Sequence, residues 1–209
     1  MKVDIWSDIV CPFCYIGKRR LEAVAAEAGI TLDVTWHSFE LDPNAPTNHS
    51  EDLATRLSKK YGRTLEQVAE MQKGIIAAGA EEGIHFKFDI ARSGNSFNAH
   101  RIIHLATEKG LGNEAEERFF KAYFIEGEAI GDRDTVERLA ISIGLDPAEV
   151  KNVLDTDLYA DAVRQDEAIA QQELKVSGVP FFVFNNRLAV SGAQPREVFH
   201  QAFQQAAES

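Results

Sequence analysis

Apolar and polar positions alternate near the N-terminus and predict two strands. In ITLDVTW, residues 30–36, every second side chain is apolar, a period typical of a half-buried strand. Residues 2–8, KVDIWSD, are partly apolar and precede a turn, so they also predict a strand. Between them, the run from Cys14 to Ala28 predicts a helix that ends at Gly29. The order strand, helix, strand predicts a parallel βαβ unit.

Helix signals fill the middle of the chain, between residues 50 and 175. A loop rich in proline, asparagine and serine, residues 41–52, precedes them. A long amphipathic pattern from Leu158 to Lys175 predicts the last helix of this block. The predicted helix starts, each marked by a capping residue, are Thr64 with Gln67 in a capping box, Ser96, Asp134, and Asp146 followed by Pro147.

The pattern returns to strands after Gly178. The run VPFFVF is continuously apolar, and RLAVSG follows it after Asn185 and Asn186. Two strands joined by a two-residue Asn-Asn turn form a hairpin. Pro195 then opens a final helix with apolar residues at helical spacing.

This order predicts an α/β fold with two domains. The two ends of the chain, residues 1–42 and 156–209, are expected to share one sheet with helices on its faces. Residues 43–155 are expected to form a large all-helical insertion between them. The length of 209 residues is enough for one large domain or for one domain that carries an insert.

The charge balance excludes two classes of partner. The formal net charge is −11, and an acidic surface repels nucleic acid and anionic membranes. No segment approaches the apolar length of a membrane span, and no signal peptide follows Met1. We therefore expect a soluble, cytoplasmic protein, and the sequence does not predict its oligomeric state.

Both cysteines of the chain lie in the motif CPFC, residues 11–14. A Cys-X-X-Cys motif beside a βαβ pattern is a redox signature. Cys11 is placed at a helix start, and Pro12 suits the first helical turn. There the helix dipole and the free N–H groups favour a thiolate, so the pKa of Cys11 is expected to lie below about 8.5. Cys14, one turn inward, is placed to attack a mixed disulfide on Cys11.

Two other interpretations of the cysteines are weaker. A zinc site needs two more ligands, and His100 and His104, spaced four apart on one predicted helix, lack an acidic third ligand in their motif. No metal site is therefore predicted. Structural thiols without a reaction remain an alternative, although a disulfide across two residues would stabilise a cytoplasmic protein little.

A second feature precedes the buried strand at the C-terminal end, in Gly178-Val179-Pro180. The proline can mark only a strand boundary, because it cannot donate a ladder hydrogen bond. Beside a Cys-X-X-Cys motif in this order of elements, we favour a cis Val179–Pro180 bond. Such a bond would expose the backbone of Val179 opposite the sulfur for pairing with a substrate chain.

These motifs carry a family resemblance that runs along the whole chain. CPFCYIGKRRLE, NAHRIIHLA and SGVPFFVFNNRLAVSGAQP together resemble the DsbA-like thiol–disulfide oxidoreductases, specifically their cytoplasmic FrnE-type branch. The resemblance implies a thioredoxin-like fold interrupted by a helical domain. It also implies that Cys11 is the nucleophile, Cys14 the resolving thiol and Pro180 a cis proline.

Two departures from the family pattern affect the expected chemistry. Phe13 stands where DsbA has a histidine, and its ring cannot hydrogen-bond to a Cys11 thiolate, so we predict a less oxidising couple than that of DsbA. Ile5 occupies the position, six residues before the first cysteine, where thioredoxin and DsbA carry an acid. Asp4 and Asp8 are nearby candidates for a proton relay to Cys14.

The predicted function is dithiol–disulfide exchange on protein or small disulfides. It needs no cofactor beyond the redox-active disulfide, with glutathione as a candidate co-substrate, and its partners are disulfide-containing proteins or small thiols. The candidate groove residues, each also compatible with core or helix packing, are Phe13, Tyr15, Phe39, Phe97, Asn98 and His100.

Two rival functions are kept open. Kappa-class glutathione transferases and hydroxychromene-carboxylate isomerases share the expected architecture, but they have a serine where Cys11 stands and lack the second thiol. This rival rests on fold analogy alone. The other rival is a chaperone-like module that binds peptides in an apolar cleft without using either thiol.

Overall fold

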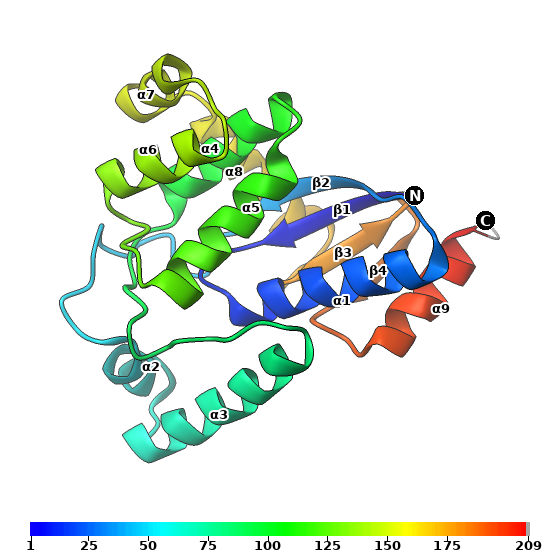
Figure 1. Ribbon diagram of the computed structural model, residues 1–209, viewed down its shortest axis with the longest axis horizontal. Helices are drawn as coiled ribbons and strands as arrows, with labels where there is room; N and C mark the ends of the chain where they lie inside the picture. Colours follow the sequence, from blue (N-terminus) through cyan, green and yellow to red (C-terminus); the bar gives the residue numbers. More distant parts are fainter. Residues whose placement is uncertain (208–209) are drawn as a thin grey trace.

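A four-stranded sheet forms the centre of the protein, which a computed structural model describes over residues 1–207. The strands follow the order β2-β1-β3-β4, with β1 parallel to β2, antiparallel to β3, and β3 antiparallel to β4 (Figure 1). Helix α1 (Pro12–Ala28) connects β1 to β2, which confirms the predicted βαβ unit. The strands are β1 (Lys2–Ser7), β2 (Asp33–Ser38), β3 (Phe181–Phe184) and β4 (Leu188–Ser191).

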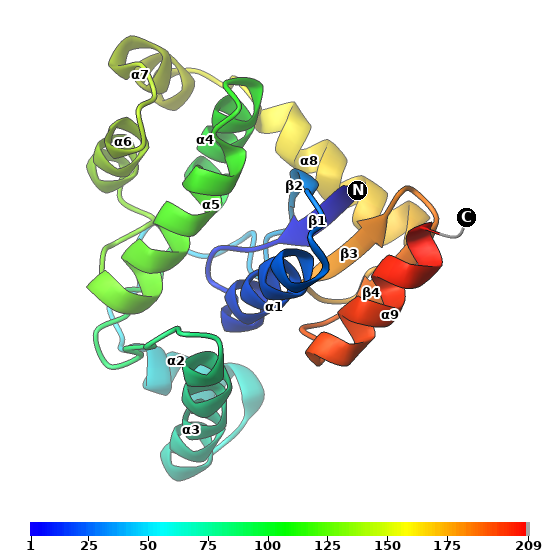
Figure 2. The same cartoon turned by 45° about the vertical axis from the view of Figure 1, so that its right-hand side comes forward.

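Every regular element between β2 and β3 is helical. Helices α4 and α5 lie beside β2, α6 and α7 lie outside them, and α2 and α3 stand apart from the sheet on the side of α1 (Figure 2). No helix within residues 1–207 is long and apolar enough to cross a membrane. The helices are α2 (Leu53–Tyr61), α3 (Leu65–Glu81), α4 (Phe97–Glu108), α5 (Gly112–Lys121), a π-helical turn (Ala122–Glu126), α6 (Arg133–Ser142), α7 (Pro147–Asp155), α8 (Ala160–Ala168) and a second π-helical turn (Ile169–Glu173).

The two faces of the sheet are covered by different helices. Helix α1 and the C-terminal helix α9 (Arg196–Ala207) lie on one face, and α8 lies on the other (Figure 2). Because successive side chains of a strand point to opposite faces, Ile5 of β1 joins the core under α1 and α9, whereas Trp6 joins a separate cluster with Phe39. Burial of one large apolar side chain contributes about 1.5–3 kcal/mol to folding.

Most of the predicted helix ends are confirmed. Gly29 ends α1 in the left-handed region with φ of 65°, where a residue without Cβ is favoured. Thr64 and Gln67 form the predicted capping box of α3. Asp146 accepts hydrogen bonds from the N–H groups of the first turn of α7, and Pro147 is its first residue.

Two predicted caps differ from the structure in detail. Ser96 occupies the N-cap position of α4, as predicted, but its side chain makes no capping hydrogen bond, and Asn95 Oδ1 accepts the hydrogen bond of Phe97 N–H instead. Helix α6 is capped by Asp132, whose carboxylate accepts from Thr135 N–H at 2.9 Å. Asp134 lies inside that helix, directly before Thr135. A capping side chain accepts from an N–H two or three residues further along, which Asp132 does and Asp134 does not.

The second strand begins later than predicted, and the C-terminal hairpin is confirmed. Ile30 N–H still donates to Ala25 O at 2.9 Å as part of the end of α1, so the strand starts only at Asp33. In the hairpin, Asn185 and Asn186 have positive φ values of 49° and 57°. Asparagine tolerates this backbone region better than most residues, and β3 and β4 pair antiparallel on either side of the turn.

Candidate active site at the start of helix α1

Cys11 lies at the boundary between a tight turn and the first helix. Its N–H donates to Asp8 O at 2.9 Å, and its backbone is extended at the position that caps α1. Pro12 is the first helical residue, where its missing N–H leaves no hydrogen bond unmade. The side chain of Cys11 is therefore held at the positive end of the helix dipole, which favours negative charge.

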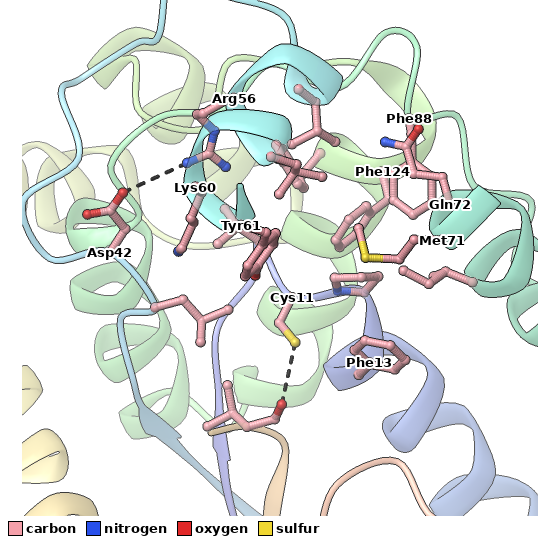
Figure 3. Close-up of a pocket in the computed structure, with 18 of the residues that line it drawn as sticks. Cys11, Phe13, Asp42, Arg56, Lys60, Tyr61, Met71, Gln72, Phe88 and Phe124 are labelled. Carbon is pink, nitrogen blue, oxygen red and sulfur yellow. Dashed lines mark hydrogen bonds and ion pairs between the residues drawn. The ribbon is translucent and has the colours of Figure 1, made fainter. Parts of the chain in front are cut away.

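The sulfur of Cys11 faces the segment before β3. Its Sγ donates to the carbonyl oxygen of Val179 at 3.5 Å (Figure 3). The peptide bond between Val179 and Pro180 is cis. Segments at opposite ends of the sequence thus meet at one sulfur atom, because β1 and β3 are neighbours in the sheet.

Cys14 is buried behind Cys11, one helical turn along. Both are free thiols, and both are almost inaccessible, with 4% of Cys11 and 1% of Cys14 exposed. Burial raises the pKa of Cys14 well above its usual range, and the neighbouring Cys11 raises it further. Interactions with the Asp8 backbone and the Ser7 side chain lower the pKa of Cys14 and partly offset the effect of burial. Cys14 therefore stays protonated at neutral pH unless a base removes its proton.

A cavity of about 270 Å³ opens beside Cys11 (Figure 3). Helices α2 and α3 form its far wall, opposite the CPFC turn and Val179. Phe13 and Tyr61 also line it and are 46% and 55% exposed, so an entering molecule meets aromatic rings. Most of the wall is apolar, with lining residues that include Leu53, Leu57, Met71, Ile75, Phe88 and Phe124.

Two cationic side chains, Arg56 and Lys60, come from α2 and line the same cavity. Arg56 lies 3.8 Å from Asp42, and its buried Nε has no hydrogen-bond partner among the described residues. A charged donor left without a partner is costly in a buried position. The cavity therefore combines an apolar wall with two cationic side chains, of which Arg56 is paired with Asp42 at the wall and Lys60 has no such partner among residues 1–207.

Five of the six predicted groove residues do not line this cavity. Only Phe13 does. Tyr15 is buried against Phe120 and its hydroxyl donates to Glu117, and Phe39 packs in the cluster with Trp6. Both side chains are turned toward the core, where they are buried.

The other three lie in α4 and serve packing there. Phe97 is half-buried under Arg164, whose guanidinium carbon lies 4.4 Å from the ring centroid. Asn98 accepts a hydrogen bond from Arg101. His100 is buried 3.4 Å from Asp8, beneath the active-site turn and not at its surface.

The two aspartates predicted as relay candidates bind different partners. Asp4 points toward α8, where it accepts from His37 at 3.0 Å. Asp8 uses its carboxylate to accept from Leu41 N–H at 2.7 Å, and it is its backbone N–H that contacts Cys14. The alternation of β1 explains why Asp4 is turned away from Cys14.

The sequence analysis missed the residues of α2 and α3 that complete the cavity. Arg56, Lys60 and Tyr61 belong to an amphipathic helix of ordinary composition, LATRLSKKY. Nothing in that pattern indicates that the helix packs across from α1. Ser7 was also missed, although it ends β1 only four residues before Cys11.

Fold and site together define the class of protein: a thioredoxin-like fold with a helical insertion and a Cys-X-X-Cys pair at the start of its first helix. Within that class, the chain belongs to the DsbA-like thioredoxin domain family, which matches residues 2–204. The predicted fold class is thereby confirmed.

Individual relatives agree with this assignment. Uncharacterized protein YwbO of Bacillus subtilis is 33% identical over 202 residues, which span 96% of this chain and 94% of that protein. The crystal structure of a probable DsbA oxidoreductase, SCO1869 of Streptomyces coelicolor, is 39% identical and covers 100% of this chain and 91% of its own, with a TM-score of 0.93. A 2-hydroxychromene-2-carboxylate isomerase shares the fold at 18% identity, with a TM-score of 0.70 over 100% of this chain and 97% of that one. The fold alone therefore does not separate redox chemistry from isomerase chemistry.

Proposed function

We propose that the protein is a thiol–disulfide oxidoreductase with Cys11 as nucleophile and Cys14 as resolving thiol. The observation that carries the proposal is the asymmetry of the pair: the Cys11 sulfur lies at a helix start beside a cavity, and the Cys14 sulfur is buried one turn behind it. One thiol is placed to meet a substrate, and the other is placed to meet only the first.

In the reducing direction, the Cys11 thiolate attacks one sulfur of a substrate disulfide, and the other substrate sulfur leaves as a thiolate. Cys14 then attacks Cys11, so a Cys11–Cys14 disulfide forms and the second substrate thiolate departs. Two electrons pass from the enzyme pair to the substrate. The oxidising direction reverses these steps, and the thiol pool of the compartment sets the direction. The cytoplasm remains the proposed compartment.

The cavity supports a disulfide substrate with an apolar body and a carboxylate. Its wall is mostly apolar, and Arg56 and Lys60 offer positive charge within it. Small acidic disulfides, with glutathione disulfide as the candidate co-substrate, fit this chemistry, as does a peptide disulfide with an apolar residue beside its cysteine. We also propose that the chain falls in the FrnE-type branch, on the motif around Cys11 and the SGVPFF segment.

Trapping tests the proposal. Cys14→Ser is expected to accumulate mixed disulfides on Cys11 when it is mixed with oxidised substrate, because the resolving thiol is gone. The double variant Cys11→Ser, Cys14→Ser is the matched control, and mass spectrometry of the adducts is the readout. Wild-type protein is expected to reduce insulin disulfides, and the double variant is expected not to reduce them. Equal adduct formation by both variants contradicts the proposal.

The two single cysteine variants, Cys14→Ser and Cys11→Ser, separate the two rival functions. A glutathione-dependent isomerase would turn over its substrate in the Cys14→Ser variant, with no disulfide reduction by the wild type. A chaperone-like module would protect an unfolding protein from aggregation equally well in the Cys11→Ser variant and the wild type, with no turnover of disulfides. Either result would replace the proposal.

A further inference from the structure

Strand β2 is the outermost strand on one side of the sheet (Figure 1). Among the described strands it pairs only with β1. The N–H groups of Asp33 and Phe39 donate to main-chain oxygens of the N-terminal segment, at the two ends of this pairing. Because the hydrogen-bonding groups of a strand alternate between its two sides, the N–H and C=O groups of Val34 and Trp36 point away from β1. Outward groups of an edge strand are open to pairing with another extended segment.

A groove of about 500 Å³ lies along this edge. It is lined by residues 32–36 of the β2 segment, by α1 and by the turn from α4 to α5. Gly110 and Gly112 of that turn bring no side chain into the groove, which leaves room beside the strand. No residue of this groove lines the cavity beside Cys11, so the two are separate surfaces.

A buried donor without a partner points to a ligand in this groove. The side chain of Trp36 lines the groove, and only 4% of the residue is exposed. Its Nε1–H has no hydrogen-bond partner among the described residues. A buried donor that stays unpaired costs free energy, and an oxygen atom of a molecule bound in the groove would remove that cost.

The unpaired charge at the groove is negative. Asp33 at the start of β2 and Glu114 in the first turn of α5 both line it, and both are exposed. Neither forms an ion pair within residues 1–207. Lys18 and Glu22 of α1 also line the groove, but their side chains pair with each other at 2.7 Å. The complement that the groove lacks is therefore a lysine or arginine side chain.

We propose that the edge of β2 binds an extended, basic segment of another protein as an added strand. The segment pairs with the outward N–H and C=O groups of Val34 and Trp36, because strand addition draws its affinity from main-chain hydrogen bonds. An oxygen atom of the segment accepts from Trp36 Nε1, and its basic side chains meet Asp33 and Glu114. The inference goes beyond the proposed function, because the groove contains neither cysteine.

A second copy of this chain fits the groove less well than a basic segment does. Two copies paired through β2 would each bring an Asp33 to the shared edge, in a protein whose formal net charge is −11. Like charges directly opposite each other on paired strands are destabilising. A dimer joined through β2 is therefore an outcome that would overturn the proposal.

Peptide titration followed by NMR tests the proposal on the wild-type protein. The probe is a capped hexapeptide of alternating threonine and lysine, which supplies oxygen acceptors and positive charge. The amide signals of Val34 and Trp36 and the indole N–H signal of Trp36 are expected to shift together. Exchange of these N–H groups with solvent is expected to slow. The same peptide with glutamate in place of lysine is expected to bind more weakly.

Two variants test the main chain and the charge separately. Val34→Pro removes one outward N–H and no bond to β1, as proline is tolerated at strand edges. It is expected to weaken binding about fivefold or more, which corresponds to about 1 kcal/mol. Asp33→Asn is expected to weaken binding of the lysine peptide several-fold. Glu66→Gln is the matched control, because it removes the same charge from an exposed position on α3, outside the groove.

Shifts confined to the β2 edge, together with weaker binding by both variants but not by the control, would support the proposal. Equal affinity of the wild type and both variants would overturn it, as would shifts centred on Cys11 or no shift at millimolar peptide. A dimer in sedimentation whose β2 amides are already protected would assign the edge to a second copy instead. If Val34→Pro loses its circular dichroism signal and is unfolded, the wild-type shifts and Asp33→Asn decide.

The disulfide chemistry is measured separately from this binding. Asp33→Asn is expected to reduce insulin disulfides at the rate of the wild type, because Asp33 lies outside the cavity beside Cys11. A failure of peptide binding at β2 therefore leaves the proposed function standing. A failure of disulfide reduction likewise leaves the binding surface standing.

Discussion

The strongest stability prediction concerns Asp166, which ties α8 to the sheet. Its carboxylate accepts from His37 at 2.8 Å and from Ser38 N–H at 2.9 Å, and it lies 3.1 Å from His104. Burial alone would raise the pKa of Asp166, but these hydrogen bonds and the charge of His37 outweigh it and lower the pKa from 3.8 to about 2. At about 1.36 kcal/mol per pH unit, the ionised carboxylate contributes about 2.5 kcal/mol to the free energy of unfolding.

The contribution has a defined pH range. Because the folded-state pKa is depressed, it is present above the unfolded value of 3.8 and is lost as the pH falls through about 2. For His37, burial lowers the pKa, but its bonds and charge interactions with Asp166 and Asp4 outweigh burial and raise it. The stability from charged His37 is therefore full below 6.5 and is lost as the pH rises through the folded-state pKa.

Asp166→Asn is expected to lower the free energy of unfolding by about 2–3 kcal/mol at about pH 6, measured by urea denaturation. The deficit is expected to shrink as the pH rises through the folded-state pKa of His37 and its charge is lost. Asp161→Asn, on the exposed side of α8, is the control, and it removes only an N-terminal dipole interaction of at most about 1 kcal/mol. A deficit equal to that of Asp161→Asn, or one that does not change with pH, would refute the reasoning.

The remaining predictions concern substrate charge, redox potential and the core. Arg56→Gln is expected to raise KM for a small acidic disulfide several-fold and to leave KM for an uncharged one unchanged; equal effects on both would exclude a charge contact with the substrate. Equilibration with a glutathione buffer is expected to give a potential below the value of about −120 mV for DsbA, because the Phe13 ring offers no hydrogen bond to the thiolate, and a potential as high as that would contradict this. Phe182→Ala is expected to lower the free energy of unfolding by about 3–5 kcal/mol, because Phe182 is fully buried against Phe199; a loss below about 1 kcal/mol in thermal or urea unfolding would show that the site collapses.

Local signals made the ends of the chain predictable. Three features of the ends depend only on residues close in sequence. They are the alternating pattern of β2, the glycine that ends α1 and the two asparagines of the hairpin turn. The same holds for the cysteine pair, since a Cys-X-X-Cys motif at a helix start places both sulfurs without long-range information.

The cavity could not be predicted in this way. Its far wall comes from α2 and α3, and their position over α1 depends on packing between segments far apart in sequence. The aromatic residues proposed for the groove were chosen by type, and type does not distinguish a ring on a core face from a ring on an open one. Tyr15 and Phe39 are both packed in the core, Tyr15 against Phe120 and Phe39 in the cluster with Trp6.

Glu116 of α5, whose buried carboxylate accepts a hydrogen bond from the Ser7 hydroxyl at 2.5 Å, is an intermediate case, because the sequence did hold a signal for its burial. The buried face of α5 consists of positions spaced three and four apart, and Glu116 falls on that face while Glu114 does not. An acid at an apolar position of such a helix indicates a carboxylate that is buried and held by specific partners. That it reaches Ser7 could not be inferred without the fold.

The pairing of β1 with β3 has a consequence for synthesis of the protein. Val3 pairs with Phe184, and Val179 O is the atom that faces the Cys11 sulfur, so nearly the whole chain separates the partners. Translation delivers the two cysteines first, and the carbonyl opposite them leaves the ribosome only 168 residues after Cys11. A nascent chain therefore carries both thiols long before the segment that faces Cys11 has been made.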